Sequence, residues 1–380
     1  MEQNFVTSYE AEQSSMKILR NYFLKEFIGP LFLALGVLTF VMILGNLVKI
    51  ADLVINKGVN IYSVSKLFLL MIPYLLTYTL PIAALTAVLL SLGRLSSDNE
   101  TVAIRASGLN LFSLILPLLI FGLILSLTLV LFNDRVIPYA HYASRKTIVD
   151  IGIKNPTAAF EPGVFINSFE KYILFIYRID KNKLSNVRIY EPQGENKAAR
   201  TIVAKRGEFI AIPEKNMIKL KLMEGTSDEP DPENPNNFYK LNFKTYFMTL
   251  NLTQMQDKDK IRKKPKDMTI TELRNEINKI KKEGIDPAPL ITEINEKISL
   301  GFACFTLMLF GLPLAIITRR REKTINFGIA FLTAGIYYLL LIGSKSLSLQ
   351  GHLNPEVAMW IPNIILGSIG AVLTYRLCAY

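Results

Sequence analysis

Six long apolar runs dominate the hydropathy pattern of the chain. A helix needs about 20 apolar residues to cross the hydrocarbon core of a bilayer, and none of the six runs contains Asp, Glu, Lys or Arg. Three runs precede and three follow a long, more polar stretch. The runs are Phe27–Val48, Leu67–Leu92, Leu111–Phe132, Ile298–Ile317, Ile325–Gly343 and Val357–Tyr375. This pattern predicts six transmembrane helices in a three-plus-three arrangement.

A short amphipathic segment leads into the first apolar run. Residues 1–16 are polar and unpatterned, whereas the apolar side chains of residues 18–27 fall near helical spacing and are accompanied by basic residues. Such a composition suits a helix lying among lipid headgroups. No small-residue cleavage site follows the first run. We therefore expect residues 1–26 to form a tail and an interfacial helix, and the first run to be a retained span rather than a signal peptide.

Alternation of apolar and polar positions replaces the apolar runs in the middle of the chain. In Met217–Leu222 the apolar side chains fall at every second position, which is the period of a strand. The segments with strand-like patterns are Tyr172–Ile179, Asn186–Tyr190, Thr201–Ile212, Met217–Met223 and Phe238–Leu252. Turn-like residues separate them at Glu191–Gly194 and Asp228–Asn237. Five such segments without helical patterns between them predict an antiparallel sandwich or open barrel.

These patterns divide the chain into consecutive parts. Residues 27–132 are expected to hold the first three spans, residues 133–268 the β domain, and residues 298–380 the last three spans. Residues 269–297 are expected to form connecting helices. Thr269 and Glu272 have the spacing of a capping box, which predicts a helix from about Ile270 to Lys282.

Lysine and arginine are distributed unequally between the short loops on the two sides of the predicted membrane. Cytoplasmic loops are enriched in these residues. If the N-terminus is cytoplasmic, the inside loops hold ten of them: Lys17, Arg20, Lys25, Arg94, Arg105, Arg319, Arg320, Arg321, Lys323 and Arg376. The outside loops then hold four: Lys49, Lys57, Lys66 and Lys345. We therefore predict that both termini are cytoplasmic and that residues 133–297, with the β domain, face the outer side of the membrane.

Composition and missing motifs exclude several classes of function. The formal net charge is +11, but the basic run at residues 319–323 is explained by membrane topology, so nucleic-acid binding is not expected. The two cysteines, Cys304 and Cys378, both lie in apolar runs and predict no disulfide framework. No G-x-S-x-G, H-E-x-x-H or phosphate-loop motif is present. We expect no enzyme activity, no cofactor and no metal site, and the chain cannot itself be a phosphate-loop ATPase.

The loop between the second and third spans carries the most informative motif. Ser97 or Asp98 could cap a short helix that starts near residue 97 and ends near residue 108. Glu100 would lie in the favourable first turn, and Gly108 would end the helix. We expect a short amphipathic helix on the cytoplasmic face. On these features alone, a connecting helix without a partner is an equally good interpretation.

This loop resembles that of the LptF/LptG (YjgP/YjgQ) family, the permeases of lipopolysaccharide export. The motif is Gly93-Arg94-Leu95-Ser96-x-Asp98-x-Glu100-x-x-Ala103-x-Arg105-Ala106-x-Gly108. Further matching positions follow in order at Glu161-Pro162-Gly163-x-Phe165, Thr271-Glu272-Leu273 with Gly284, Glu296-Lys297-Ile298, Phe310-Gly311-Leu312-Pro313-Leu314 and Trp360-Ile361-Pro362-Asn363. One departure is Gly301, near which such permeases often carry a proline.

The resemblance implies a fold, a function and a set of partners. Such permeases are inner-membrane proteins of Gram-negative bacteria with a periplasmic β-jellyroll domain. They pair with a second permease subunit of the same family and are powered by a cytoplasmic ABC ATPase dimer. They extract lipopolysaccharide from the membrane, work with a single-span periplasmic jellyroll subunit, and pass the lipid toward a periplasmic bridge.

The resemblance also points to candidate site residues. The helix at residues 97–108 would be the coupling helix that docks on the ATPase, with Asp98, Glu100, Ala103, Arg105 and Gly108 as its contact residues. Basic side chains near the outer membrane boundary would contact the phosphates of lipopolysaccharide: Lys49, Lys57, Lys66, Arg135 and Lys345. Spans one and five would form the lateral gate. The simpler alternative for each basic residue is that it extends to membrane lipid headgroups.

Two other classes of function remain open. The chain could be an envelope scaffold or signal relay that binds a partner through its β domain. It could also be a membrane-bound hydrolase or transferase acting on lipid, for which Asp134 and His141 are the nearest candidate pair. A chance pairing explains these two residues equally simply.

Overall fold

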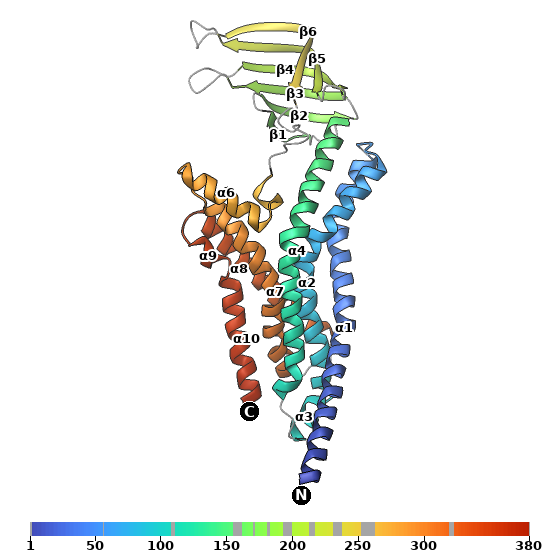
Figure 1. Ribbon diagram of the computed structural model, residues 1–380. Helices are drawn as coiled ribbons and strands as arrows, with labels where there is room; N and C mark the ends of the chain where they lie inside the picture. Colours follow the sequence, from blue (N-terminus) through green and yellow to red (C-terminus); the bar gives the residue numbers. More distant parts are fainter. Residues whose placement is uncertain are drawn as a thin grey trace. The chain divides into compact units, whose positions relative to one another are not determined.

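Two compact units make up the chain in the computed structural model, which describes all residues except 1, 56, 108–110, 155–161, 170–171, 181–182, 193–199, 213–216, 231–237, 252–262, 319–322 and 380. The helical unit comprises Met1–Gly45, Ile72–His141 and Lys264–Tyr380. The sheet unit comprises Asn46–Met71 and Tyr142–Lys263. Figure 1 shows the helices and strands of each unit.

Long apolar helices confirm that the chain is built to cross a membrane several times. Five helices in the described part of the chain are long and apolar enough: α1 (Glu2–Ile55), α2 (Ile61–Ser97), α4 (Leu111–Lys154), α7 (Ala288–Thr318) and α8 (Lys323–Leu349). The last helix, α10 (Ile361–Ala379), is apolar but shorter, so the sixth crossing stays a prediction. Both ends of the chain lie at the end of the helical unit that carries α3 (Glu100–Ala106) (Figure 1).

Helices extend well beyond the apolar runs that predicted them. The third apolar run ends at Phe132, but α4 continues to Lys154, so this run does not mark the end of the helix. Likewise α1 starts at Glu2 and has no break before the first apolar run. Hydropathy marks where a helix leaves the hydrocarbon, whereas a helix ends only where its backbone pattern is interrupted.

The centre of the helical unit is formed by α2 and α7. Within an apolar window of 18 residues in each helix, the buried share of the residues is 72% for α2 and 67% for α7 but only 17% for α1. Ala83, Leu85 and Val88 of α2 are fully buried, as are Leu307 and Leu312 of α7. Because lipid tails are as apolar as the core, close packing rather than the hydrophobic effect holds such helices together.

Short helices lie at the end of the helical unit opposite α3 (Figure 1). These are the 3₁₀ turn η3 (Pro265–Asp267), α6 (Ile270–Lys282) and α9 (Pro355–Ala358). The capping box predicted for α6 is confirmed, since the Thr269 hydroxyl accepts from the Glu272 amide and the Glu272 carboxylate accepts from the Thr269 amide. The limits predicted for α6 from sequence match the helix.

A six-stranded antiparallel sheet forms most of the sheet unit. Its strands are β1 (Phe165–Phe169), β2 (Tyr172–Asp180), β3 (Lys183–Glu191), β4 (Arg200–Ile212), β5 (Met217–Pro230) and β6 (Phe238–Asn251). Inward side chains such as Leu174, Val187 and Phe209 form its core. Strand β1 was not predicted, and β5 includes Asp228–Pro230, which the sequence assigned to a turn. These residues belong to the sheet because they pair with β4 or β6.

The order of the strands differs from the predicted jelly roll. Each described strand pairs with its neighbours in the chain, in the order β1-β2-β3-β4-β5-β6. This is a meander, whereas a jelly roll is built from two Greek keys in which strands distant in sequence pair. The antiparallel sheet is therefore confirmed, and the jelly-roll connectivity is not.

Candidate functional site

A tight turn joins α2 to α3 at the motif that the sequence singled out. The backbone of Asn99 adopts a left-handed conformation (φ 59°), and its carbonyl accepts from the amides of Val102 and Ala103. The Ser97 hydroxyl donates to the Arg94 carbonyl at 2.8 Å. Ser97 therefore closes the end of α2, and the prediction that it could cap α3 is wrong. Asp98 lies exposed in the turn itself.

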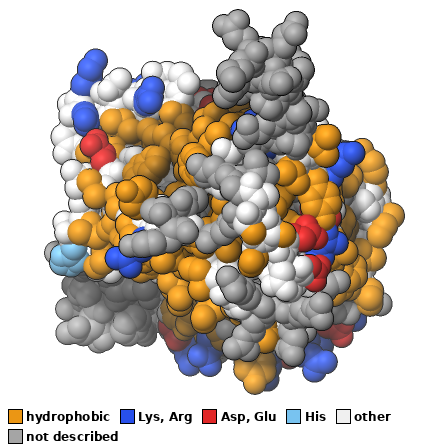
Figure 2. All heavy atoms as spheres, turned by 90° about the horizontal axis from the view of Figure 1, so that it is seen from below, with side chains coloured by type: hydrophobic (Ala, Val, Ile, Leu, Met, Phe, Trp, Pro, Cys, Tyr) orange, Lys and Arg blue, Asp and Glu red, His pale blue; other side chains and the backbone are white. Residues whose placement is uncertain are grey.

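One face of α3 is buried and the other is exposed. Thr101 is buried, whereas Val102, Ala103 and Ala106 are exposed. Figure 2 views the helical unit from the end that carries α3 and shows apolar side chains over much of its described surface. The side chain of Arg105 and all of Gly108 lie outside the described residues. A short helix is thus present within the predicted range 97–108, and its exposed described side chains are small and apolar.

Polar side chains connect α3 with the first helix. The Tyr22 hydroxyl of α1 lies 3.5 Å from the Glu100 carboxylate of α3 and accepts from Arg94 at 3.1 Å. Arg94 also forms an ion pair with Glu26 at 3.0 Å. We call these four residues the Tyr22 network. The sequence did not predict the Tyr22 network, because Tyr22 and Glu100 are 78 positions apart and no local pattern indicates that they meet.

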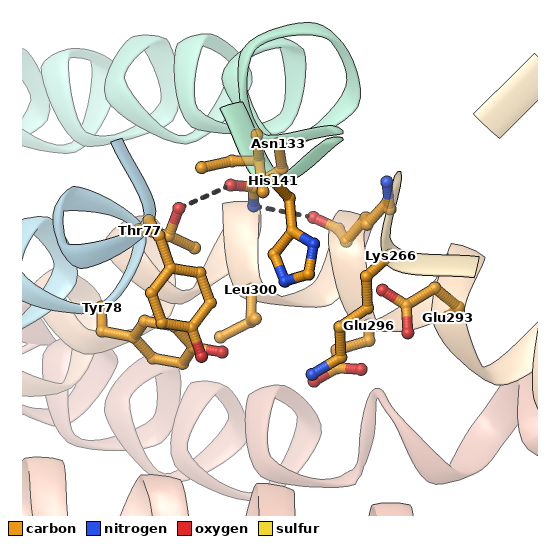
Figure 3. A pocket seen from close by; sticks show the side chains of 11 residues that line it. Thr77, Tyr78, Asn133, His141, Lys266, Glu293, Glu296 and Leu300 are labelled. Atoms are coloured by element: carbon orange, nitrogen blue, oxygen red, sulfur yellow. Dashed lines mark hydrogen bonds between the residues drawn. The ribbon is translucent and has the colours of Figure 1, made fainter. Parts of the chain in front are cut away.

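At the opposite end of the helical unit, a second set of charged side chains lines a small cavity of about 50 Å³. Figure 3 shows His141, Glu293 and Glu296 directed into this space. Asn133 closes one side, because it accepts from Thr77 at 3.0 Å and donates to the Lys297 carbonyl at 3.1 Å. The cavity has room for a few water molecules and none for a lipid.

Lys345, a predicted lipid-contacting residue, is engaged beside this cavity. Its ammonium group forms an ion pair with Glu296, which joins α8 to α7. One turn away the hydroxyls of Thr292 and Ser348 are hydrogen-bonded at 2.9 Å. A ligand that binds Lys345 must therefore compete with Glu296.

The other predicted basic residues belong to both units of the chain. Arg135 is exposed on α4 and has no ion pair within the described part of the chain. Lys57 and Lys66 belong to the sheet unit, where Lys57 lies 4.0 Å from Asp52. The side chain of Lys49 lies outside the described residues.

Asp134 and His141 have separate partners rather than one another. The Asp134 carboxylate accepts from the Ile270 amide at 2.6 Å, at the start of α6. His141 Nδ1 lies 2.7 Å from the buried carboxylate of Asp267. The ammonium group of Lys297 donates to the Met268 carbonyl at 2.5 Å. All three contacts fix the segment that leads into α6, which gives Asp134 and His141 a structural role and leaves the hydrolase interpretation without support.

Comparison with known proteins gives a consistent result over nearly the whole chain. Residues 21–376 match the family model described as lipopolysaccharide export system permease LptF/LptG. The lipopolysaccharide export system permease protein LptF of Escherichia coli K12 is 21% identical over 365 residues, which cover 94% of each chain. The protein of the same name in Shigella flexneri matches equally. An uncharacterized protein of Rickettsia prowazekii is 24% identical over 172 residues, covering 45% of this chain and 47% of its own.

The matched region contains every predicted span, the sheet and α3. The apolar helices agree with a protein that crosses the inner membrane several times. The chain belongs to the LptF/LptG family of lipopolysaccharide export system permeases.

Proposed function

We propose that this chain is a permease subunit that extracts lipopolysaccharide from the inner membrane and passes it to a periplasmic bridge, driven by a separate cytoplasmic ATPase dimer. It would pair with a second permease subunit of the same family and with a single-span periplasmic jellyroll subunit. The observation that carries the proposal is α3, a short helix between two spanning helices with an exposed, mostly apolar face.

The predicted orientation would put α3 where a cytoplasmic ATPase could reach it. The excess of Lys and Arg in alternate loops predicts that the end of the helical unit that carries α3 is cytoplasmic. The sheet, which lies between α4 and α6 in the chain, would then be periplasmic. Val102, Ala103 and Ala106 would contact a groove on the ATPase, and Asp98 and Arg105 would add charged contacts that set the register of docking.

The substrate contacts follow from the chemistry of lipopolysaccharide, which carries phosphates and acyl chains. Lys345 and Arg135 of the helical unit, with Lys49, Lys57 and Lys66 of the sheet unit, would contact the phosphates. Acyl chains need apolar surface, and the exposed side chains of α1 supply it, for example Phe32, Val37 and Phe40.

The last strand of the sheet supports a role for the β domain in handing the lipid on. One edge of β6 pairs with β5, and the other edge pairs with no strand in the described part of the chain. Free strand edges are sites where a strand of another protein can add to a sheet. The exposed Tyr239, Leu241 and Phe247 on β6 would offer apolar contacts to the lipid or to such a strand.

Co-purification in mild detergent tests the proposal, with Ala103→Arg as the informative variant. Arginine at this exposed position should block docking on the ATPase and leave the Tyr22 network intact. We expect an ATPase and a second six-span subunit to co-purify with the wild type, and only the second subunit to co-purify with Ala103→Arg. Ser185→Arg, which adds the same group at an exposed position of β3, is the matched control.

The result also separates the proposal from its alternative. If wild type, Ala103→Arg and Ser185→Arg all lack an ATPase and a second subunit, the proposal fails and the envelope scaffold becomes the better interpretation. If Ala103→Arg retains as much ATPase as Ser185→Arg, α3 is not the docking helix.

A further inference from the structure

Within the helical unit, the first helix is most deeply buried near Tyr22. Phe23 and Phe27 are at most 1% exposed, and Leu31 and Ala34 pack in the same cluster. Beyond this point most side chains of α1 in the helical unit are exposed in the isolated chain. Movement of the neighbouring helices can therefore reach α1 through this buried end.

Polar contacts surround this anchored end on the side that faces α3. Tyr22 and Glu26 lie one turn apart on α1, and Arg94 at the end of α2 binds both. Glu100 in the first turn of α3 adds a second partner to the Tyr22 hydroxyl. Nearby, the Arg20 guanidinium donates to the Ser113 carbonyl of α4 at 3.1 Å. The end of α1 is therefore tied to α2, α3 and α4.

Stability does not account for these contacts. The side chains of Arg94 and Glu26 are 46% and 27% exposed, and exposed ion pairs contribute little to the free energy of folding. Close packing of Phe23 and Phe27 in the core cluster already holds this part of the helix. The polar contacts instead connect α1 with the helix to which the ATPase is proposed to bind.

We propose that Tyr22 is a positioning residue that transmits movement of α3 to α1, through its contacts with Glu100 and Arg94. This inference rests on the proposed function, because it requires an ATPase that moves α3. The Tyr22 hydroxyl is suited to this role because it contacts side chains of both α2 and α3. When Glu100 shifts relative to Arg94, the distances from the Tyr22 hydroxyl to its two partners change. Tyr22 follows this shift, and α1 moves with Tyr22.

Arg94 and Glu100 of the loop motif take on more specific roles in this arrangement. Arg94 binds Tyr22 and Glu26 of α1 and so keeps the Tyr22 hydroxyl near α3. Glu100 faces α1 as well as the cytoplasm, so its role within the chain adds to any contact with the ATPase. Truncating Glu100 would disturb both roles, whereas Tyr22→Phe removes a single hydroxyl and leaves the surface of α3 unchanged.

Reconstituted vesicles containing the complete complex test the inference. Wild type, Tyr22→Phe and the control Tyr62→Phe are compared by the ATPase retained and by the lipopolysaccharide released per ATP hydrolysed. The Tyr62 ring is exposed and its hydroxyl has no contact within the described residues, so the control loses the same group without a partner. For Tyr22→Phe we expect ATPase retention at the wild-type level and about a fivefold fall in lipid released per ATP, the factor for one lost hydrogen bond of ordinary net strength.

A spin label on α1 separates a positioning role of Tyr22 from a purely structural one, because it reports whether α1 moves when the ATPase is trapped. With Cys304 and Cys378 replaced by alanine, a nitroxide at Phe40→Cys reports the movement of an exposed part of α1. We expect trapping of the ATPase with vanadate and ATP to change the spectrum in the wild-type background and to change it much less with Tyr22→Phe. Adding Glu100→Gln to Tyr22→Phe should reduce lipid release no further than the stronger single change, because both act on the same contact.

The outcomes distinguish this inference from the proposed function. If Tyr22→Phe releases as much lipid per ATP as Tyr62→Phe, or if the spin label responds as strongly with Tyr22→Phe as in the wild-type background, the inference is overturned. A wild-type complex that contains no ATPase would instead overturn the proposed function.

Discussion

At the scale of single residues, Gly301 explains the departure from the proline expected near this position. A Cβ atom placed on Gly301 would lie 2.9 Å from the backbone nitrogen and 3.0 Å from the Cα atom of Val130 on α4. Both are backbone atoms, which cannot move aside as a flexible side chain can. Glycine is therefore required because α4 and α7 touch at this point, a reason that could not be read from the sequence of either helix.

Gly301→Ala tests this reading of the helix contact. Forcing a methyl group into a packed site costs about 1–3 kcal/mol, so the thermal midpoint in detergent should fall. Gly335→Ala on α8, where nothing lies within 4 Å of an added Cβ atom, is the matched control and should not lower the midpoint. Equal midpoints for the two variants would show that the helices do not meet as closely as described.

The ion pair between Glu296 and Lys345 leads to a prediction with opposite signs for its two partners. If Lys345 binds a phosphate of the lipid, Glu296 competes for the same ammonium group. Glu296→Gln should then bind lipopolysaccharide about threefold to tenfold more tightly, and Lys345→Gln correspondingly more weakly, because each change strengthens or removes one charge-assisted hydrogen bond to the phosphate. Binding of labelled lipopolysaccharide to protein in nanodiscs measures both.

Two further variants serve as controls for the Glu296–Lys345 pair. Glu276→Gln removes a carboxylate from the exposed pair with Lys279 on α6 and should leave lipid binding unchanged. The double variant of Glu296 and Lys345 should resemble Lys345→Gln. Weaker binding by Glu296→Gln in a normally folded protein would mean that the ion pair supports the site rather than competing with it.

At the scale of elements, features set by neighbouring residues could be predicted from the sequence, whereas contacts between distant residues could not. The capping box of α6 and the position of α3 depend on residues a few places apart, so sequence sufficed for both. The His141–Asp267 and Glu296–Lys345 contacts join residues 126 and 49 positions apart, and only helix packing decides such pairs. Strand β1 was missed because its short segment, Phe165–Phe169, does not show a clear alternation.

Asp134 offers a test of how α4 holds the start of α6. Its carboxylate sits against the first amide of α6, where a negative charge is favourable. Asp134→Asn keeps an acceptor and loses the charge, which should weaken this contact by about 0.3–1 kcal/mol. Hydrogen exchange at the first turn of α6 should then become about twofold to fivefold faster.

The same charge change at the opposite end of the helical unit provides the control for this experiment. Asp98→Asn, in the turn before α3, should leave exchange in α6 unchanged. Equal exchange in all three proteins would mean that the capping box alone, formed by Thr269 and Glu272, holds the start of the helix.

At the scale of the whole molecule, the order of elements was predictable and their detailed assembly was not. Apolar runs and strand alternation predicted the succession of helices, sheet and helices, because each depends on a local period. Strand pairing and the choice of α2 and α7 as the central helices depend on contacts between elements. The Tyr22 network and the cavity around Asn133 are absent from any local pattern for the same reason.

The sparse packing in the middle of α1 also has a mechanical consequence. From Ala34 to Gly45 the helix extends for about 16 Å at 1.5 Å per residue, and only partly buried side chains such as Leu35, Leu38 and Thr39 contact the rest of the unit along this stretch. If the helix pivots at Ala34 as a rigid rod, a tilt of about 10° moves Gly45 by about 3 Å. A slight adjustment at α3 would thus become a larger displacement inside the bilayer, where the acyl chains of a lipid have to pass.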